Sequence, residues 1–482
     1  MAKQKKAKQK RIKPQVLKGF RDYPPGEQIA RNKMIGKLRE AVELMGFLPL
    51  QTASLEFAET LLGSHYNEDS LGELFGFNGP DDIEMALRYE FTISLARYVA
   101  GNPTLALPFR RYQYGNVWRV DKPGPGRFRE FMQFDIDIVG TLNLLADAEI
   151  IAAMVTTLNH LGINRFQVRY SNRKILNGLI EYAGIPSEQG PDVMRVIDKL
   201  EKQGRQAVIE ELGPGRVDKS GDKIKGLNLD TSHIAQIEKF LDIAGLPDNQ
   251  QLEAVETFLG DIDVARAGIE ELREIQSYLS AMRFDNDKTK IDLSIVRGLG
   301  YYTGPVWETI LLDLPDYGSI FSGGRYDNLV ERFQGTQIPG TGSSIGIDRL
   351  LAALLALNTL KVTKATSFAL VTVMDKDKLP QYLEILSELR EAGIPSEIYS
   401  GNTKNLTKQI KYGDKAEIPF AVIVGSEEFD AGKVTVKNLA AGRQKALETV
   451  DREEWLQAED IQETISRQEL IGYLLREIDN DT

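Results

Sequence analysis

Cysteine is absent from this chain, and histidine occurs only three times, as His65, His160 and His233. Without cysteine there are no disulfides, no zinc–thiolate sites and no cysteine nucleophile. The three histidines share no metal-ligand spacing, so we expect no metal site built from side chains. No stretch reaches the apolar length of a membrane span, and the N-terminus lacks the apolar core of a secretory signal. We therefore expect a soluble cytoplasmic protein without a membrane partner.

Charge is distributed unevenly along the 482 residues. The net formal charge is −11, which argues against general binding of polyanions, yet the first thirteen residues hold seven Lys or Arg and no acid. A basic arm on an acidic body is typical of contact with a phosphate backbone. A solubilising tail explains the same composition equally well, and both interpretations stay open.

The pattern of the chain predicts several domains, as its length allows. Two β-rich runs, Phe109–Val120 and Phe128–Val139, flank a Pro- and Gly-containing loop and predict a long hairpin. Beyond the residues around Lys361, strands alternate with helices, which predicts a small α/β domain with a largely parallel sheet. The expected domains are an arm (1–17), a first core half (18–171), a helical insertion (172–286), a second core half (287–360), the α/β domain (365–455) and a helical tail (456–482).

The segment Arg297–Gly304 carries one cation, two adjacent phenols and three glycines. It follows Ile291–Val296, whose alternating apolar residues predict a half-buried strand. Glycines at this density let the backbone approach a ligand closely. A pocket for a small polar molecule and an anion is one interpretation, and a glycine-rich turn beside a buried Tyr pair is the other.

Three further clusters each follow an apolar run: Leu87–Thr92, the hairpin from Arg119 to Asp137, and Gly340–Arg349. Alternate residues of a strand share a face, so Gln133, Asp135 and Asp137 are expected to point the same way. Guanidinium groups suit phosphate because they donate two parallel hydrogen bonds and stay charged. Together the clusters favour a site for a nucleotide and a small polar substrate.

These segments resemble the motifs of the histidyl-tRNA synthetase family, which is part of the class II aminoacyl-tRNA synthetases. Arg297–Gly304 resembles its histidine-binding segment, Arg119–Asp137 its motif 2 and Gly342–Arg349 its motif 3. Leu87–Thr92 resembles the loop that binds the amino acid and ATP, and Gly323–Asp327 also matches. The residues of the Leu87–Thr92 loop and of motif 2 are similar to those of the eukaryote-like branch of the family.

The resemblance implies an α+β fold: a class II antiparallel sheet core flanked by helices, a helical insertion, and a C-terminal anticodon-binding-like α/β domain. It implies a homodimeric histidine–tRNA ligase, an aminoacyl-tRNA ligase that uses L-histidine, ATP with Mg²⁺ and tRNA(His). The implied catalytic residues are Arg119 and Arg297, and the implied ATP-binding residues are Arg119, Arg127 and Arg349. The implied histidine-binding residues are Glu90, Thr92, Gln133, Asp137, Arg297, Tyr301 and Tyr302.

The chain departs from the family pattern at Gly300, where an Asp is common, and at Thr52-Ala53, where motif 1 usually carries Thr-Pro. An alternative function is a synthetase-like regulatory subunit of ATP phosphoribosyltransferase, which keeps the core without aminoacylating tRNA. Such a subunit usually lacks the C-terminal domain and degrades motifs 2 and 3. Because Arg119, Arg297 and Arg349 are all present, we favour the active ligase.

Overall fold

The computed structural model describes residues 12–63, 74–124, 127–217, 221–284, 287–296, 301–360, 362–401, 405–448 and 461–481. Arg297 and Gly300 therefore lie outside the described residues, as does most of the basic arm. Internal contacts divide the chain into two compact units. The first comprises Met1–Asp22 and Met34–Thr359, and the second comprises Tyr23–Lys33 and Leu360–Thr482.

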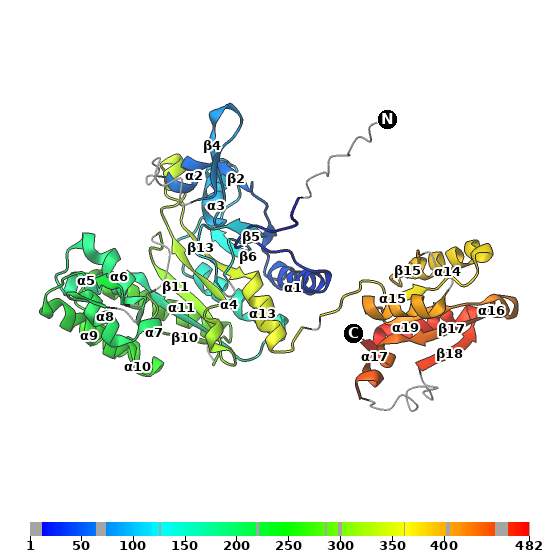
Figure 1. The fold of residues 1–482 in the computed structure, drawn as a ribbon. Helices are drawn as coiled ribbons and strands as arrows, with labels where there is room; N and C mark the ends of the chain where they lie inside the picture. Colours follow the sequence, from blue (N-terminus) through cyan, green and yellow to red (C-terminus); the bar gives the residue numbers. More distant parts are fainter. Residues whose placement is uncertain are drawn as a thin grey trace. The chain divides into compact units, whose positions relative to one another are not determined.

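A mixed sheet, eight-stranded in its described part, forms the centre of the first unit, and Figure 1 labels β5, β6, β13, β11 and β10 of it. Its strand order is β1-β5-β6-β13-β12-β11-β7-β10. Its central strands pair antiparallel, whereas β1 with β5 and β10 with β7 pair parallel at the two edges. The strands are β1 (Leu48–Pro49), β5 (Phe109–Trp118), β6 (Glu130–Val139), β7 (Phe166–Asn172), β10 (Thr289–Ile291), β11 (Pro305–Leu311), β12 (Phe321–Tyr326) and β13 (Gly340–Gly346).

The expected hairpin is present as β5 and β6, which pair from Phe109 opposite Val139 to Trp118 opposite Glu130. The next neighbour of β6 is β13, more than 200 residues further along the chain, with Gly342 opposite Asp137. The sheet therefore brings the motif 2-like and motif 3-like segments side by side.

Helices pack on this sheet because their inward faces are apolar. Helix α4 (Leu145–His160) buries a run of Ala, Ile, Met and Val side chains and packs on β13, β6, β12 and β7. Helix α13 (Ile347–Ala356) packs on β6 and β13, and α1 (Pro25–Glu43) precedes β1. Along the described stretches, no helix is long and apolar enough to cross a membrane.

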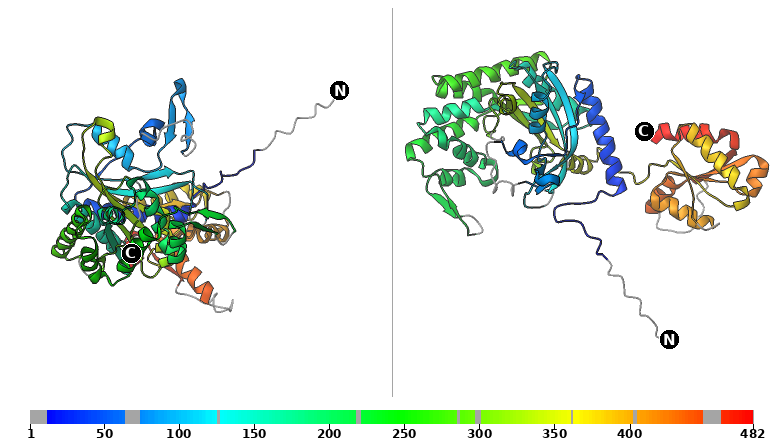
Figure 2. Two further views of the ribbon diagram at one scale, coloured as in Figure 1. Left: turned by 90° about the vertical axis from the view of Figure 1, so that its left-hand side faces the viewer. Right: turned by 90° about the horizontal axis from the view of Figure 1, so that it is seen from above.

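The helical insertion lies beside the β7–β10 edge of the sheet (Figure 2). Its helix α11 packs against α4, α5 and β7, and α10 packs against β10. The elements are α5 (Arg173–Tyr182), α6 (Gly190–Ile197), α7 (Leu200–Gln203), α8 (Arg205–Leu212), β8 (Gly215–Val217), β9 (Lys223–Lys225), α9 (Thr231–Ala244), α10 (Asp248–Leu259) and α11 (Asp263–Ala281).

A small sheet in the order β2-β4-β3 leads into helix α3, at the start of which the Leu87–Thr92 segment lies. Its strands are β2 (Leu55–Phe57), β3 (Gly76–Asn78) and β4 (Glu84–Leu87). The helices α2 (Ala58–Leu62) and α12 (Glu331–Gln334) pack against α3 (Thr92–Ala100).

The strand expected over Ile291–Val296 is wrong beyond Ile291, where β10 ends. The backbone and hydroxyl of Ser294 both donate to Asp292 Oδ1, at 3.1 and 2.5 Å. Leu293 N donates to Gln251 Oε1 at 2.9 Å. Because side chains, one nearby and one distant in sequence, satisfy these backbone groups, the segment turns instead of extending the sheet.

The second unit holds a sheet whose described strands follow the order β15-β14-β16-β17-β18. The expectation of a largely parallel sheet is only half right, since β14 pairs parallel with β15 and β16 while β17 pairs antiparallel with β16 and β18. The elements are β14 (Ala369–Val371), α14 (Leu379–Glu391), β15 (Ser396–Ile398), α15 (Leu406–Ala416), β16 (Phe420–Ile423), α16 (Ser426–Ala431), β17 (Lys433–Asn438), α17 (Leu439–Glu448), β18 (Gln462–Ser466) and α19 (Leu470–Asp481).

The last two elements fall within the range 456–482, which the sequence suggested to be a separate helical tail. Strand β18 pairs with β17, and Leu470 and Leu474 of α19 are buried in the same core as Ile385 and Val422. The described end of the chain is thus an integral part of the second unit.

Candidate active site

One cavity of about 510 Å³ opens over the β6–β13–β12 face of the central sheet. Its walls come from the start of α3, the β5–β6 connection and the strands β6, β11, β12 and β13. The structure brings nine of the ten proposed site residues to this cavity: Glu90, Thr92, Arg119, Arg127, Gln133, Asp137, Tyr301, Tyr302 and Arg349. The tenth, Arg297, lies outside the described residues.

Glu90 is buried at the N-terminus of α3. Its carboxylate accepts hydrogen bonds from Thr92 N at 2.7 Å and Ile93 N at 2.6 Å. Burial raises the pKa of Glu90, while these backbone donors and the charge of Arg119 oppose the shift. The helix end thus fixes one carboxylate at the cavity wall.

Asp137 is buried in the cavity wall and has two partners. Tyr326 donates its hydroxyl to Asp137 Oδ1 at 2.6 Å, and Arg111 Nη2 lies 2.7 Å from Asp137 Oδ2 as an ion pair. Burial raises the pKa of Asp137, and the Arg111 charge and the Tyr326 hydroxyl counter that effect. Gly342 opposite leaves the necessary space, because a Cβ there would lie 2.0 Å from Asp137 Oδ1.

Tyr301 and Tyr302 pack edge to face, with ring centroids 4.9 Å apart, and Tyr301 also meets the Tyr326 ring. Burial raises the pKa of both Tyr301 and Tyr302, so both phenols are hydrogen-bond donors at neutral pH. They supply neutral donors beside the carboxylates of Glu90 and Asp137.

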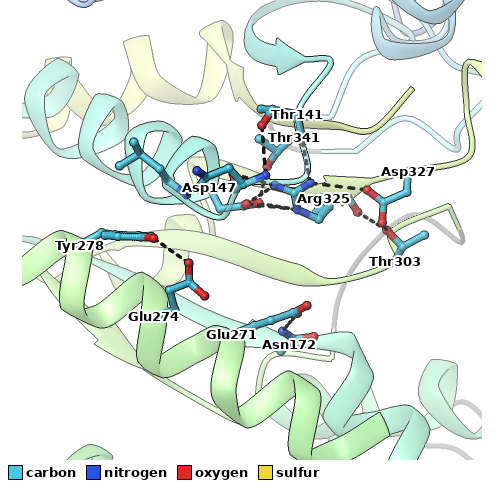
Figure 3. A network of polar contacts seen from close by, with 12 residues as sticks. Thr141, Asp147, Asn172, Glu271, Glu274, Tyr278, Thr303, Arg325, Asp327 and Thr341 are labelled. Atoms are coloured by element: carbon cyan, nitrogen blue, oxygen red, sulfur yellow. Dashed lines mark hydrogen bonds and ion pairs between the residues drawn. The ribbon is translucent and has the colours of Figure 1, made fainter. Parts of the chain in front are cut away.

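A buried polar network holds the chain directly after this Tyr pair (Figure 3). Thr303 N donates to Arg325 O at 2.9 Å, and the Thr303 hydroxyl donates to Asp327 Oδ2 at 2.5 Å. The Arg325 guanidinium is paired with Asp147 of α4, which also accepts from the Thr341 hydroxyl at 2.8 Å. Strands β12 and β13 and helix α4 thereby fix the segment that carries the two tyrosines.

The opposite end of the cavity is cationic. Arg119 Nε donates to Tyr89 O at 3.0 Å, and its guanidinium lies over the Phe131 ring at 5.2 Å from the centroid. Arg127 is exposed and bonds Asp121, whereas Arg349 Nη1 donates to Ser319 O at 2.6 Å. Three guanidinium groups anchored around one opening can bind phosphate oxygens.

Three residues of the acidic end are absent from the site residues proposed from the sequence. Arg111 is fully buried beside Asp137, Tyr326 bonds the same carboxylate, and Asp135 lines the cavity. The alternation of β6 already placed Asp135 on this face, but nothing in the sequence marked Arg111. Arg88, in one of the noted clusters, instead points to the backbone oxygens of Thr52, Ala53 and Asn116.

The cavity therefore combines a carboxylate-rich end with an arginine-rich end. A zwitterion with a polar side chain fits the first, and a nucleotide phosphate fits the second. Across the described parts of the chain, no group of three or more His, Asp or Glu side chains gathers as a metal-ligand set.

Comparison with known proteins identifies the family of each part of the chain. The family model described as Histidyl-tRNA synthetase matches residues 19–350, and the one described as Anticodon binding domain matches residues 368–477. A Histidine–tRNA ligase of Jannaschia sp. (strain CCS1) is 42% identical, over 94% of this chain and 95% of the relative. One from Dinoroseobacter shibae (strain DSM 16493 / NCIMB 14021 / DFL 12) is 43% identical over the same shares.

The crystal structure of histidyl-tRNA synthetase from Nostoc sp. PCC 7120 superposes with a TM-score of 0.79 at 29% identity, covering 97% of this chain and all of that one. The curated relatives are bacterial, so they do not support the assignment to a eukaryote-like branch that the motif residues suggested. The match over most of the length shows that this chain belongs to the histidyl-tRNA synthetase family.

Proposed function

We infer that this chain is a histidine–tRNA ligase. It activates L-histidine with ATP to give histidyl-adenylate and pyrophosphate, and then transfers histidine to the 3′ end of tRNA(His). The observation that carries this function is the single cavity with two ends, one rich in buried carboxylates and phenols and one rich in arginine. That polarity matches the two substrates of the first step.

Histidine occupies the acidic end in this proposal. Glu90, Thr92 and Gln133 are available to the α-ammonium group, and Asp137, Tyr301 and Tyr302 to the ring and its surroundings. An amino acid that lacks these donors would leave buried acceptors unpaired, and such a mismatch is the strongest basis for rejecting a competitor.

ATP occupies the cationic end. The histidine carboxylate attacks the α-phosphorus, the bond to the β-phosphate oxygen breaks, and pyrophosphate leaves. Arg119 and, by the family resemblance, Arg297 stabilise the charge that grows on the phosphoryl oxygens, while Arg127 and Arg349 hold the rest of the nucleotide. One fixed donor of this kind contributes ~3 kcal/mol to such a transition state. A carboxylate is already a nucleophile, so this step needs no general base.

Mg²⁺ enters the proposal with ATP. Mg²⁺ commonly rests on substrate phosphates and one or two carboxylates, and Glu308 of β11 is a carboxylate on the cavity wall. When bound, the ion would neutralise charge on the departing pyrophosphate. The donor set is compatible with an ion held mainly by the nucleotide.

The α/β domain expected over 365–455 belongs to the second unit, which is the proposed anticodon reader. Helix α15 carries Lys408, Lys411 and Lys415 within two turns, a spacing suited to backbone phosphates. Lys404, which precedes them in the sequence, lies outside the described residues. A solvated helix face explains the same lysines, so binding of tRNA by this unit is part of the proposal.

A homodimer is the proposed assembly. Among the described strands, β1 lies at one edge of the central sheet; Leu48 within it and Leu44 before it are 57% and 80% exposed. Apolar side chains at such a sheet edge favour burial against a second copy. Sedimentation equilibrium tests this assembly, and a monomer at micromolar concentration would contradict it. Cytoplasmic location stays a proposal of the same kind.

Histidine-dependent ATP–pyrophosphate exchange, run with each of the twenty amino acids, tests the function. We expect exchange with histidine far above all others, followed by charging of tRNA(His). A protein that binds histidine but supports no exchange would instead favour the regulatory-subunit alternative.

A further inference from the structure

The acidic end of the cavity contains buried acceptors that no donor of the described chain satisfies. Gln133, Asp135 and Asp137 occupy alternate positions of β6, are all buried, and all line the cavity. Within the described chain, Gln133 Oε1 and Asp135 Oδ1 accept no hydrogen bond, whereas both oxygens of Asp137 have a partner. An unpaired buried acceptor costs ~1–3 kcal/mol, so the two together indicate a ligand that donates hydrogen bonds.

The two carboxylates differ in how well their charge is supported. Asp137 accepts a hydrogen bond from the Tyr326 hydroxyl and forms an ion pair with the Arg111 guanidinium. The charge of Arg111 and the hydroxyl of Ser344 favour ionisation of Asp135, whereas the charges of Asp137 and Glu90 disfavour it. Burial, the largest effect, raises the pKa of Asp135 to about 7. Of this pair, Asp135 is therefore the group that exchanges a proton near neutral pH.

The spacing of the two carboxylates suits an imidazole ring. Residues two apart on a strand lie ~6.6 Å from each other on one face. Two hydrogen bonds of ~2.8 Å, one from each ring nitrogen, span roughly 7–8 Å across the ring, which side chains at that spacing can reach. Small residues of β13 leave room, because Gly342 lies opposite Asp137 and Ser344 opposite Asp135.

We propose that Asp135 is a further specificity-determining residue, which shares one proton with the imidazole nitrogen that does not face Asp137. The proposal rests on histidine occupying this cavity. In the complex a single proton lies between Asp135 and the ring, either as carboxylate and imidazolium or as carboxyl and neutral imidazole. No covalent bond changes, and the proton is exchanged with solvent when histidine binds.

This arrangement makes histidine affinity depend on pH in a defined way. Above pH 7 neither free Asp135 nor free histidine holds the shared proton, so binding takes up one proton and affinity falls by at most ~tenfold per pH unit. Below pH 6 both partners are protonated, so binding releases one. Affinity is therefore greatest near pH 6.5–7. The charged or titratable groups that face Asp135 from the packed elements are Arg88, Glu90, Arg111, Asp137 and Tyr302.

Calorimetric titration of the full chain with histidine, between pH 5.5 and 8.5 and in buffers of different ionisation enthalpy, measures both affinity and proton exchange. For the native protein we expect uptake of about one proton at pH 8 and release of about one at pH 5.5. In Asp135→Asn the amide supplies its own hydrogen bond, so the loss of affinity between pH 7 and 8.5 should disappear. The matched control is Glu130→Gln on the same strand, whose carboxylate bonds Trp118 and Asn116 outside the cavity.

An unchanged pH profile in Asp135→Asn would overturn the proposal. If that variant does not fold, Ser344→Ala provides the test. Loss of its hydroxyl should raise the pH above which histidine affinity begins to fall. If that pH is the same in Ser344→Ala as in the native protein, the role of Asp135 is refuted. Failure of the native protein to bind histidine at any pH would refute the proposed function itself, which is a different outcome.

Discussion

Replacing Gly342 by Ala is the sharpest test of how the sheet shapes the amino-acid end of the cavity. The new Cβ would lie 2.0 Å from Asp137 Oδ1, 2.5 Å from its Cγ and 2.7 Å from the backbone oxygen of Ile136. All three distances are shorter than van der Waals contact, and one of the three atoms belongs to the backbone, so Asp137 must move. It would then lose its present alignment with Tyr326 and Arg111.

The expected result is a large, selective loss of histidine affinity. A hydrogen bond to a charged group contributes ~1.5–3 kcal/mol, which corresponds to a ~10–150-fold rise in KM for histidine. Overpacking should also lower the free energy of unfolding by ~1–3 kcal/mol. Pyrophosphate exchange measured against histidine and ATP separately, together with urea denaturation, distinguishes the two effects.

The comparison variant is Gly346→Ala on the same strand, where the added Cβ meets nothing closer than Arg349 Cβ at 3.9 Å. Its KM for histidine should change far less than that of Gly342→Ala. If Gly342→Ala kept the native KM for histidine, the carboxylate of Asp137 would not contact the substrate, and the proposed geometry of this end would be refuted.

Four further outcomes are expected. Arg119→Ala should lower kcat for exchange by ~10²–10³ with little change in histidine binding, because its guanidinium acts on the phosphoryl charge. Arg325→Met should lower the free energy of unfolding, measured by urea denaturation, by ~3–5 kcal/mol, because it leaves Asp147 buried without its cation. The folded-state pKa of Asp135, about 7, lies above its ordinary value, so its contribution to stability is complete below pH 4 and is lost as pH rises to 7. Asp135→Asn should therefore gain stability over the native protein by at most ~1.4 kcal/mol per pH unit in that range, measured by denaturation at each pH. Deleting residues 1–13 should weaken tRNA binding more at low salt than at high salt, if the arm contacts phosphates.

The hairpin was predictable because its two strands are long, rich in β-formers and separated by an obvious loop. Local pattern also placed Gln133, Asp135 and Asp137 on one face, and β6 confirms that arrangement. The neighbours of β6 were not predictable in this way. Strand β13 joins it from more than 200 residues away, and only family resemblance linked the two segments.

The two wrong expectations, a strand over Ile291–Val296 and a helical tail over 456–482, have a common physical cause. Ile291–Val296 alternates like a strand, but Asp292 and Gln251 capture its backbone donors through side chains. Range 456–482 has helical composition in part, yet β18 finds its partner in β17. In each case a contact distant in sequence, or a side chain competing with the backbone, decided the outcome.

Arg111 shows why the site itself exceeds what the sequence could predict. On β5 it is one of two consecutive arginines, Arg110 and Arg111, in a strand that also looks solvated. Alternation sends Arg110 to Glu149 and Arg111 to the buried Asp137. A one-residue change of register would exchange these environments and leave Asp137 buried without a cation. The amino-acid end of the cavity therefore depends on strand register as much as on the identity of its residues.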